Sequence, residues 1–203
     1  LNGAAQNGHL SVVEWLPPNV QRHMLNRGGN EDALNLAVEN GNLSVVEWLV
    51  KNHFSGLTQE ALDKAAGSGY LNVVECVIAH RRSERPTPKA ISFAAEKGSI
   101  HVVEWLHSKF FLEARCNTSA MDLAAKGAHL PVVEWLHVNR SEGCTTRAMD
   151  LAARQGHLAV VQWLHTNRSE GCTKEAFLRA ARNGHLSVVE WLHANRHEQL
   201  SSW

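Results

Sequence analysis

The feature that most constrains this chain is that it repeats itself. The stretch NRSEGCT occurs at residues 139–145 and again at residues 167–173, 28 positions apart. A longer core, written GHLSVVEWL at residues 184–192, recurs in seven copies at steps of 28 to 33 residues. Units this short cannot bury an apolar face alone, so neighbouring copies must share one continuous core. The slot held mostly by Trp contains Trp15, Trp48, Cys76, Trp105, Trp135, Trp163 and Trp191.

Each unit predicts two short helices. In residues 145–168, Thr145 is a good N-cap, and the small pair Ala152-Ala153 precedes Gly156, where a positive φ would end the first helix. The second helix then carries an apolar stripe of Leu158, Val160, Val161, Trp163 and Leu164. The sequence therefore predicts an all-α solenoid of about seven stacked helix-turn-helix repeats. We expect one array over residues 1–197, with repeats at about 1–28, 29–56, 57–85, 86–115, 116–143, 144–171 and 172–197, and a tail at 198–203.

The repeated turn places Cys144 and Cys172 in the same slot, directly before a capping Thr. Five residues later come Met149 and Phe177, which is the spacing of a hydrophobic staple. The alternative is a metal site or a disulfide between neighbouring copies. Equivalent atoms in stacked helix pairs lie roughly 10 Å apart, whereas a disulfide needs Cα atoms within about 7 Å. We therefore interpret these cysteines as small apolar staples.

Composition and motifs exclude several classes of protein. The 20 basic and 20 acidic residues balance, so the chain is not a polycation built to coat nucleic acid. No apolar run approaches the ~20 residues of a membrane span, and only four cysteines favour a reducing, intracellular compartment, cytoplasm or nucleus. The chain has no nucleophile elbow, phosphate loop or HExxH motif. We therefore expect that the chain is not an enzyme, and that it has no catalytic residue, metal site or cofactor.

Histidines form two ladders that are candidate zinc ligands. Equivalent members repeat at stacking distance, which is too long for one ion with Zn–N bonds of ~2 Å. We therefore expect them to cap turns and line the surface. The first ladder follows the Gly turn and the second follows the Trp-Leu pair: His9, His129, His157 and His185, then His107, His137, His165 and His193.

The stretch AARNGHLSVVEWL at residues 180–192 resembles the ankyrin repeat, with its small-small pair, Gly-His turn, Val-Val and paired leucines. The arrays most similar to this Trp-rich version of about 28 residues are large tandem ankyrin-like families of oomycetes. The Thr-Pro-Leu-His start of ankyrins is replaced here by Arg147-Ala148-Met149-Asp150. The link between repeats is also shorter, so we expect compact turns in place of β-hairpin fingers. The longer first step leaves room for a finger remnant around Val20–Gly29.

The surface that differs between copies is the exposed face of the first helix, just before each turn. The resemblance implies that this face lines a concave groove and carries the partner contacts. Reading along the copies, it changes from neutral or acidic to basic, with apolar residues beside the cations. This pattern suits an acidic, amphipathic peptide or protein partner. The candidate partner-binding residues are Lys64, Phe93, Glu96, Lys97, Leu123, Lys126, Leu151, Arg154, Gln155, Arg179, Arg182 and Asn183.

Two other functions stay open from the sequence. One is a structural spacer or scaffold segment of a longer multidomain protein, in which these residues are ordinary solvated side chains. The other is an RNA-binding solenoid that uses the basic C-terminal end. Zero net charge and the lack of stacking aromatics on that face weigh against nucleic acid. We expect a monomer unless uncapped ends of the array stack.

Overall fold

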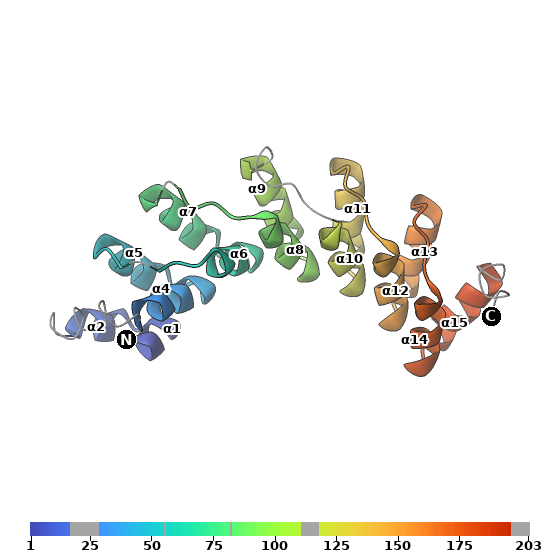
Figure 1. The fold of residues 1–203 in the computed structure, drawn as a ribbon, viewed down its shortest axis with the longest axis horizontal. Helices are drawn as coiled ribbons and strands as arrows, with labels where there is room; N and C mark the ends of the chain where they lie inside the picture. Colours follow the sequence, from blue (N-terminus) through green and yellow to red (C-terminus); the bar gives the residue numbers. More distant parts are fainter. Residues whose placement is uncertain (17–28, 55, 82, 111–117, 196–203) are drawn as a thin grey trace. The chain divides into compact units, whose positions relative to one another are not determined.

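The computed structural model describes residues 1–16, 29–54, 56–81, 83–110 and 118–195, and the side chains of residues 29–32 lie outside this description. The chain divides into two compact units, Leu1–Ala90 and Ile91–Trp203. All regular structure among the described residues is helical, which confirms the predicted all-α solenoid of stacked repeats (Figure 1). The predicted tail and all but the last residue of the predicted finger remnant fall outside the described residues.

The helices come in pairs, and we name the members of each pair helix one and helix two. The first members are α1 (Asn2–Gln6), α4 (Gly29–Glu39), α6 (Gln59–Gly67), α8 (Pro88–Glu96), α10 (Ser119–Lys126), α12 (Thr146–Arg154) and α14 (Lys174–Arg182). The second members are α2 (Leu10–Trp15), α5 (Leu43–Lys51), α7 (Leu71–His80), α9 (Ile100–Phe110), α11 (Leu130–Asn139), α13 (Leu158–Asn167) and α15 (Leu186–Asn195). In the second unit, α12 packs beside α10 on one side and α14 on the other (Figure 1).

Local chemistry sets the ends of helix one. Thr145 lies in the extended region, and its Oγ accepts a hydrogen bond from the Arg147 amide at 3.2 Å, as predicted for the N-cap of α12. Gly156 has φ +81, which confirms the predicted glycine turn. In the corresponding turn after α10, Ala128 takes φ +61. An L-residue with a Cβ adopts that conformation at a cost of about 1–2 kcal/mol.

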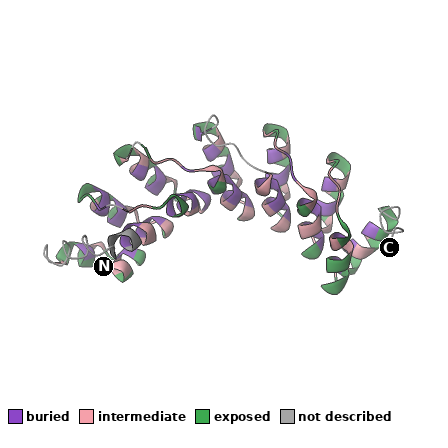
Figure 2. Cartoon of the chain, viewed as in Figure 1, coloured by how far each residue is buried: buried purple, intermediate pink, exposed green. Residues whose placement is uncertain are grey.

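The core forms where helices of one repeat face each other and the next repeat (Figure 2). In the sixth repeat the buried residues include Ala152, Ala153, Val160, Val161 and Leu164, and most other described repeats bury the same slots. The buried stripe of helix two is narrower than predicted, because the side chains of the Trp slot lie at the edge of the core. Trp163 and Leu158 are half-buried, and Trp15 is 78% exposed.

In the fifth and sixth repeats, a carboxylate of helix one accepts hydrogen bonds from the Thr that caps helix one of the next repeat. Asp122 of α10 is 4% exposed, and its two oxygens accept from the backbone N–H and the hydroxyl of Thr145, at 2.9 and 2.7 Å. Asp150 accepts the same two bonds from Thr173 at 2.8 and 2.7 Å. Burial raises the pKa of Asp122, and the hydrogen bonds from Thr145 oppose that rise. These polar links fix how far neighbouring repeats rotate against each other.

The histidines after the glycine turns also join repeats. The Nε2 atoms of His129 and His157 lie 3.0 and 3.1 Å from the backbone oxygens of Glu96 and Lys126, at the end of the preceding helix one. Asn42 serves the same slot in the first unit, where its side-chain amide donates to the Ala5 and Gln6 oxygens. Each interaction satisfies a carbonyl at a helix C-terminus. His129 and His157 of the first ladder therefore cap helices, and they do so across the repeat boundary.

The NRSEGC turn joins repeats through its arginine. Arg140 forms an ion pair with Glu142 of its own turn and contacts Nδ1 of His107 in the preceding repeat at 3.2 Å. The His107 ring meets Trp135 edge-on, with centroids 5.1 Å apart. Burial and the Arg140 guanidinium hold the pKa of His107 below its usual value. The same set recurs one repeat later with Arg168, Glu170, His137 and Trp163.

Cys144 of this turn is buried beside Arg168 of the next repeat. Cys144 and Met149 are 7% and 1% exposed, so both staple partners lie in the core. Burial and the nearby Glu170 raise the pKa of the Cys144 thiol to about 11. Cys76, Cys144 and Cys172 are all free thiols. A buried neutral thiol is what an apolar staple requires.

Candidate partner-binding face

The predicted site residues lie in the last turn of helix one or directly after it. Lys64 belongs to the unit Leu1–Ala90, and all the others belong to the unit Ile91–Trp203. Within the second unit, Lys97, Arg154, Gln155, Arg179, Arg182 and Asn183 are exposed. The apolar members Phe93, Leu123 and Leu151 are half-buried, so part of each side chain already packs within the array. We call the residues of this set in the second unit the helix-one face.

Lys64 is the most strongly neutralised of the predicted cations. Its Nζ lies 3.0 Å from Glu60 on the same helix and 3.3 Å from Glu39 of the preceding repeat. Hydrogen bonds to these two carboxylates raise the pKa of Lys64, and the same contact lowers the pKa of Glu60. The first unit therefore offers little uncompensated positive charge at this slot.

Lys126 and Glu96, both predicted to contact a partner, contact each other. The Lys126 ammonium lies 2.8 Å from Glu96 across the repeat boundary. Both side chains are more than a third exposed, so this pair adds little to stability. Its consequence is electrostatic, because Lys126 is no longer an unmatched cation of the helix-one face.

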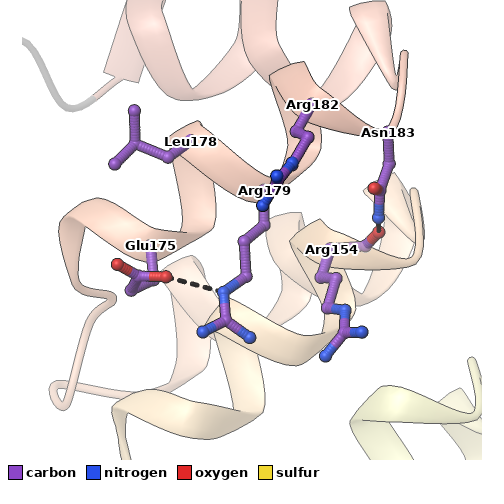
Figure 3. A pocket seen from close by; sticks show the side chains of 6 residues that line it. All are labelled: Arg154, Glu175, Leu178, Arg179, Arg182 and Asn183. Carbon is purple, nitrogen blue, oxygen red and sulfur yellow. Dashed lines mark hydrogen bonds and ion pairs between the residues drawn. The ribbon is translucent and has the colours of Figure 1, made fainter.

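Four of the predicted residues line one hollow on α12 and α14 (Figure 3), and its volume is about 590 Å³. Arg154, Arg179, Arg182 and Asn183 form its polar wall, and Glu175 and Leu178 complete it. We call it the arginine hollow. Its volume falls within the range of pockets that hold ligands or side chains of a partner. The C-terminal end of the helix-one face is therefore recessed, and its cations converge there.

The three arginines of the hollow differ in whether a carboxylate pairs with them. Arg179 donates from Nε to Glu175 at 2.6 Å, an i,i+4 pair on α14. Among the described residues, no carboxylate pairs with Arg154 or Arg182. These two residues occupy the same slot in adjacent repeats, the slot that holds Lys126 in the fifth. The arginine hollow therefore contains two uncompensated guanidinium groups.

Asn183 has a positioning role. Its side-chain amide donates to the backbone oxygen of Arg154 at 2.8 Å (Figure 3). That bond ties the end of α14 to the end of α12. The distance between the backbones that carry Arg154 and Arg182 is fixed as a result.

Two residues of the hollow, Glu175 and Leu178, are absent from the predicted set. Both lie earlier on α14 than the last-turn slots that were considered. A comparison of the copies slot by slot would have found Leu178, which is 46% exposed. The corresponding residues are polar in the five preceding repeats: Asn35, Asp63, Ser92, Asp122 and Asp150. Asn35, Asp63, Asp122 and Asp150 each accept a hydrogen bond from the Thr that caps helix one of the next repeat, whereas Leu178 is apolar and exposed.

The helix pairs, their glycine turns and their shared core define a helical-repeat solenoid with a variable face on helix one. The family model described as ankyrin repeats (3 copies) matches residues 1–88, and that described as ankyrin repeats (many copies) matches residues 121–165. The chain belongs to the ankyrin-repeat family. Ankyrin repeats are generally protein–protein interaction modules, and the family is known for non-enzymatic functions.

Among solved structures, the chain is similar to the human ASB11 ankyrin repeat domain. The match has a TM-score of 0.55 at 16% sequence identity and covers 93% of this chain and 96% of that one. At this identity the likeness supports the fold alone. The search of curated proteins found no significant match.

Other properties of the described residues bear on what the chain binds. They contain no group of three or more side chains suited to hold a metal ion. In the same part of the chain, no helix is long and apolar enough to cross a membrane.

Proposed function

We propose that the chain is a non-enzymatic protein-binding module that holds a partner peptide or protein on the helix-one face of its second unit. The contacts centre on the arginine hollow, with the half-buried Leu123 of α10 and Leu151 of α12 as apolar contacts. The sparse, free cysteines support a reducing, intracellular compartment for this activity.

One observation carries the proposal. Lys64 and Lys126 are paired with carboxylates of the array, whereas Arg154 and Arg182 are exposed without such a partner among the described residues. Arginine is enriched at the energetically dominant positions of protein interfaces, where it combines an extended apolar stem with a donor fork. Two such groups in one recess, beside an exposed leucine, are the arrangement expected of a contact centre.

The test is affinity capture from a lysate of the source cell, with quantitation by mass spectrometry. The wild-type chain is compared with the double variant Arg154→Glu, Arg182→Glu. The matched control is Lys109→Glu, Arg147→Glu, which makes the same change in net charge at exposed positions of the second unit outside the hollow. Circular dichroism must first show that all three chains have equal helix content.

We expect at least one protein to be retained by the wild type and the control and lost from the hollow variant. That protein is then purified and its affinity for the three chains measured directly. Identical captures by all three chains would refute binding at this face and favour the spacer function. Retention of RNA, with a strong dependence on salt, would favour a nucleic-acid-binding solenoid.

A further inference from the structure

We infer that the arginine hollow accepts an extended acidic segment of the partner, in which two carboxylate side chains flank an apolar residue. This inference rests on the proposed function and specifies the chemistry of its ligand. Arg154 and Arg182 each receive one carboxylate, and the apolar residue packs on Leu178 (Figure 3).

The charges of the hollow set the number of acidic residues. Its lining contains three arginines and one carboxylate, and Glu175 already neutralises Arg179. Two positive charges are left, so two carboxylates balance them. Each guanidinium presents a planar fork of donors that matches a carboxylate in a bidentate pair.

The spacing of the two arginines sets the spacing of the acidic residues. Arg154 and Arg182 end helices that pack as neighbours, so their backbones stand about one interhelix distance apart, roughly 8–10 Å. A chain in the extended polyproline II conformation rises about 3.1 Å per residue with three residues per turn, so side chains three positions apart lie on one face. Acidic residues about three positions apart therefore reach both arginines, with the apolar residue between them. The Asn183 bond to the Arg154 carbonyl holds this spacing before the partner arrives.

The lining of the hollow favours a protein segment over a nucleic acid. It contains no aromatic side chain on which a base could stack. Leu178 offers an apolar contact that a phosphate backbone does not use. The Glu175 carboxylate would lie against any phosphate that entered beside Arg179, and like charges in a recess repel.

Glu175 also gives the site a selectivity that can be measured. Its carboxylate holds Arg179 and repels acidic residues that approach from that side. Replacement by Gln removes the repulsion and releases Arg179 toward the ligand. The inference therefore predicts that Glu175→Gln increases affinity for acidic peptides, a gain that a damaged fold would not produce.

The experiment is selection of short random peptides displayed on phage against the whole chain, followed by fluorescence anisotropy with the selected peptides. We expect enrichment of sequences with two acidic residues about three positions apart around an apolar residue. Arg154→Gln and Arg182→Gln should each weaken binding about tenfold or more, because each removes charge-assisted hydrogen bonds. Glu175→Gln should strengthen binding several-fold, and the control Arg147→Gln should leave it unchanged.

Two results would overturn the inference. One is enrichment of peptides without the acidic pair, or of none. The other is binding that is insensitive to both arginine variants or is weakened by Glu175→Gln. If either occurs while lysate capture still depends on the helix-one face, the proposed function stands and only the ligand chemistry is wrong. If capture is also independent of Arg154 and Arg182, both proposals fail.

Discussion

The buried carboxylate that joins the fifth and sixth repeats makes a quantitative prediction. Asp122→Ala removes two hydrogen bonds and leaves the Thr145 backbone N–H without its partner. Hydrogen bonds to a charged group contribute about 1.5–3 kcal/mol each. The gain from no longer burying a carboxylate offsets part of this loss. We expect a net decrease of roughly 3 kcal/mol in the free energy of unfolding.

Two further variants show how much of this effect comes from burial of the carboxylate and how much from its charge. Asp150→Ala tests burial, and Asp122→Asn tests charge. Asp150 makes the same bonds to Thr173 but is only half-buried, so water replaces the lost acceptor in Asp150→Ala. The expected decrease there is about 1–1.5 kcal/mol. Asp122→Asn should lose less than about 1 kcal/mol. The second repeat shows why, since the Asn35 side-chain oxygen accepts from the backbone N–H and the hydroxyl of Thr58 at 2.8 and 3.2 Å.

The assay is urea denaturation followed by circular dichroism, together with hydrogen exchange at the Thr145 amide. Exchange at that amide should accelerate in Asp122→Ala and change little in Asp122→Asn. The reasoning would be refuted if Asp122→Asn were as destabilising as Asp122→Ala, because the geometry would then not matter. A larger effect at Asp150 than at Asp122 would refute the role assigned to burial.

Three further predictions concern the turns and the histidine ladder. Ala128→Gly should stabilise the chain by about 0.5–1 kcal/mol in thermal denaturation, because glycine adopts the positive φ without strain. Ala159→Gly, at an exposed helical position, should destabilise it by up to about 1 kcal/mol. A change of the same sign in both variants would contradict this reasoning. Gly143→Ala should destabilise more than Gly184→Ala by urea denaturation. Both glycines have positive φ, but only at Gly143 would a Cβ collide with a guanidinium of the next repeat, that of Arg168. Burial holds the pKa of His157 below its ordinary value, so its contribution to stability is complete above the unfolded pKa of about 6.5 and is lost as pH falls through the folded pKa. His157→Asn, which keeps a donor for the same carbonyl, should reduce the loss of stability between pH 7 and 5; an unchanged pH profile would contradict this.

The sequence predicts where the candidate residues lie on helix one, and their contact with a partner stays a prediction. Exposure of Arg154 and Arg182 follows from their place on helix one, and the sequence placed them there. The neutralisation of Lys126 depends on Glu96, which is 30 positions away. Leu178 is absent from the predicted set because that set contains only residues at the end of helix one. The other copies have polar residues in the slot of Leu178, and this difference is visible in the sequence.

The sequence by itself determined the elements whose causes are local. Helix starts at Thr145 and Thr173, the turn at Gly156 and the buried Ala-Ala and Val-Val pairs follow from interactions within about four residues along the chain. Repetition then determined the stacking, since each unit must bury the same face.

Only the tertiary structure decided which charges are left over. The partners in Lys64–Glu39, Asp122–Thr145 and Arg168–His137 stand 25, 23 and 31 positions apart. They meet because consecutive repeats pack in one register, and a rotation of one repeat against the next would exchange the partners. Whether a cation is neutralised within the array or available to a ligand depends on distances of a few ångströms between side chains of adjacent repeats. These distances cannot be derived from the spacing of residues along the sequence.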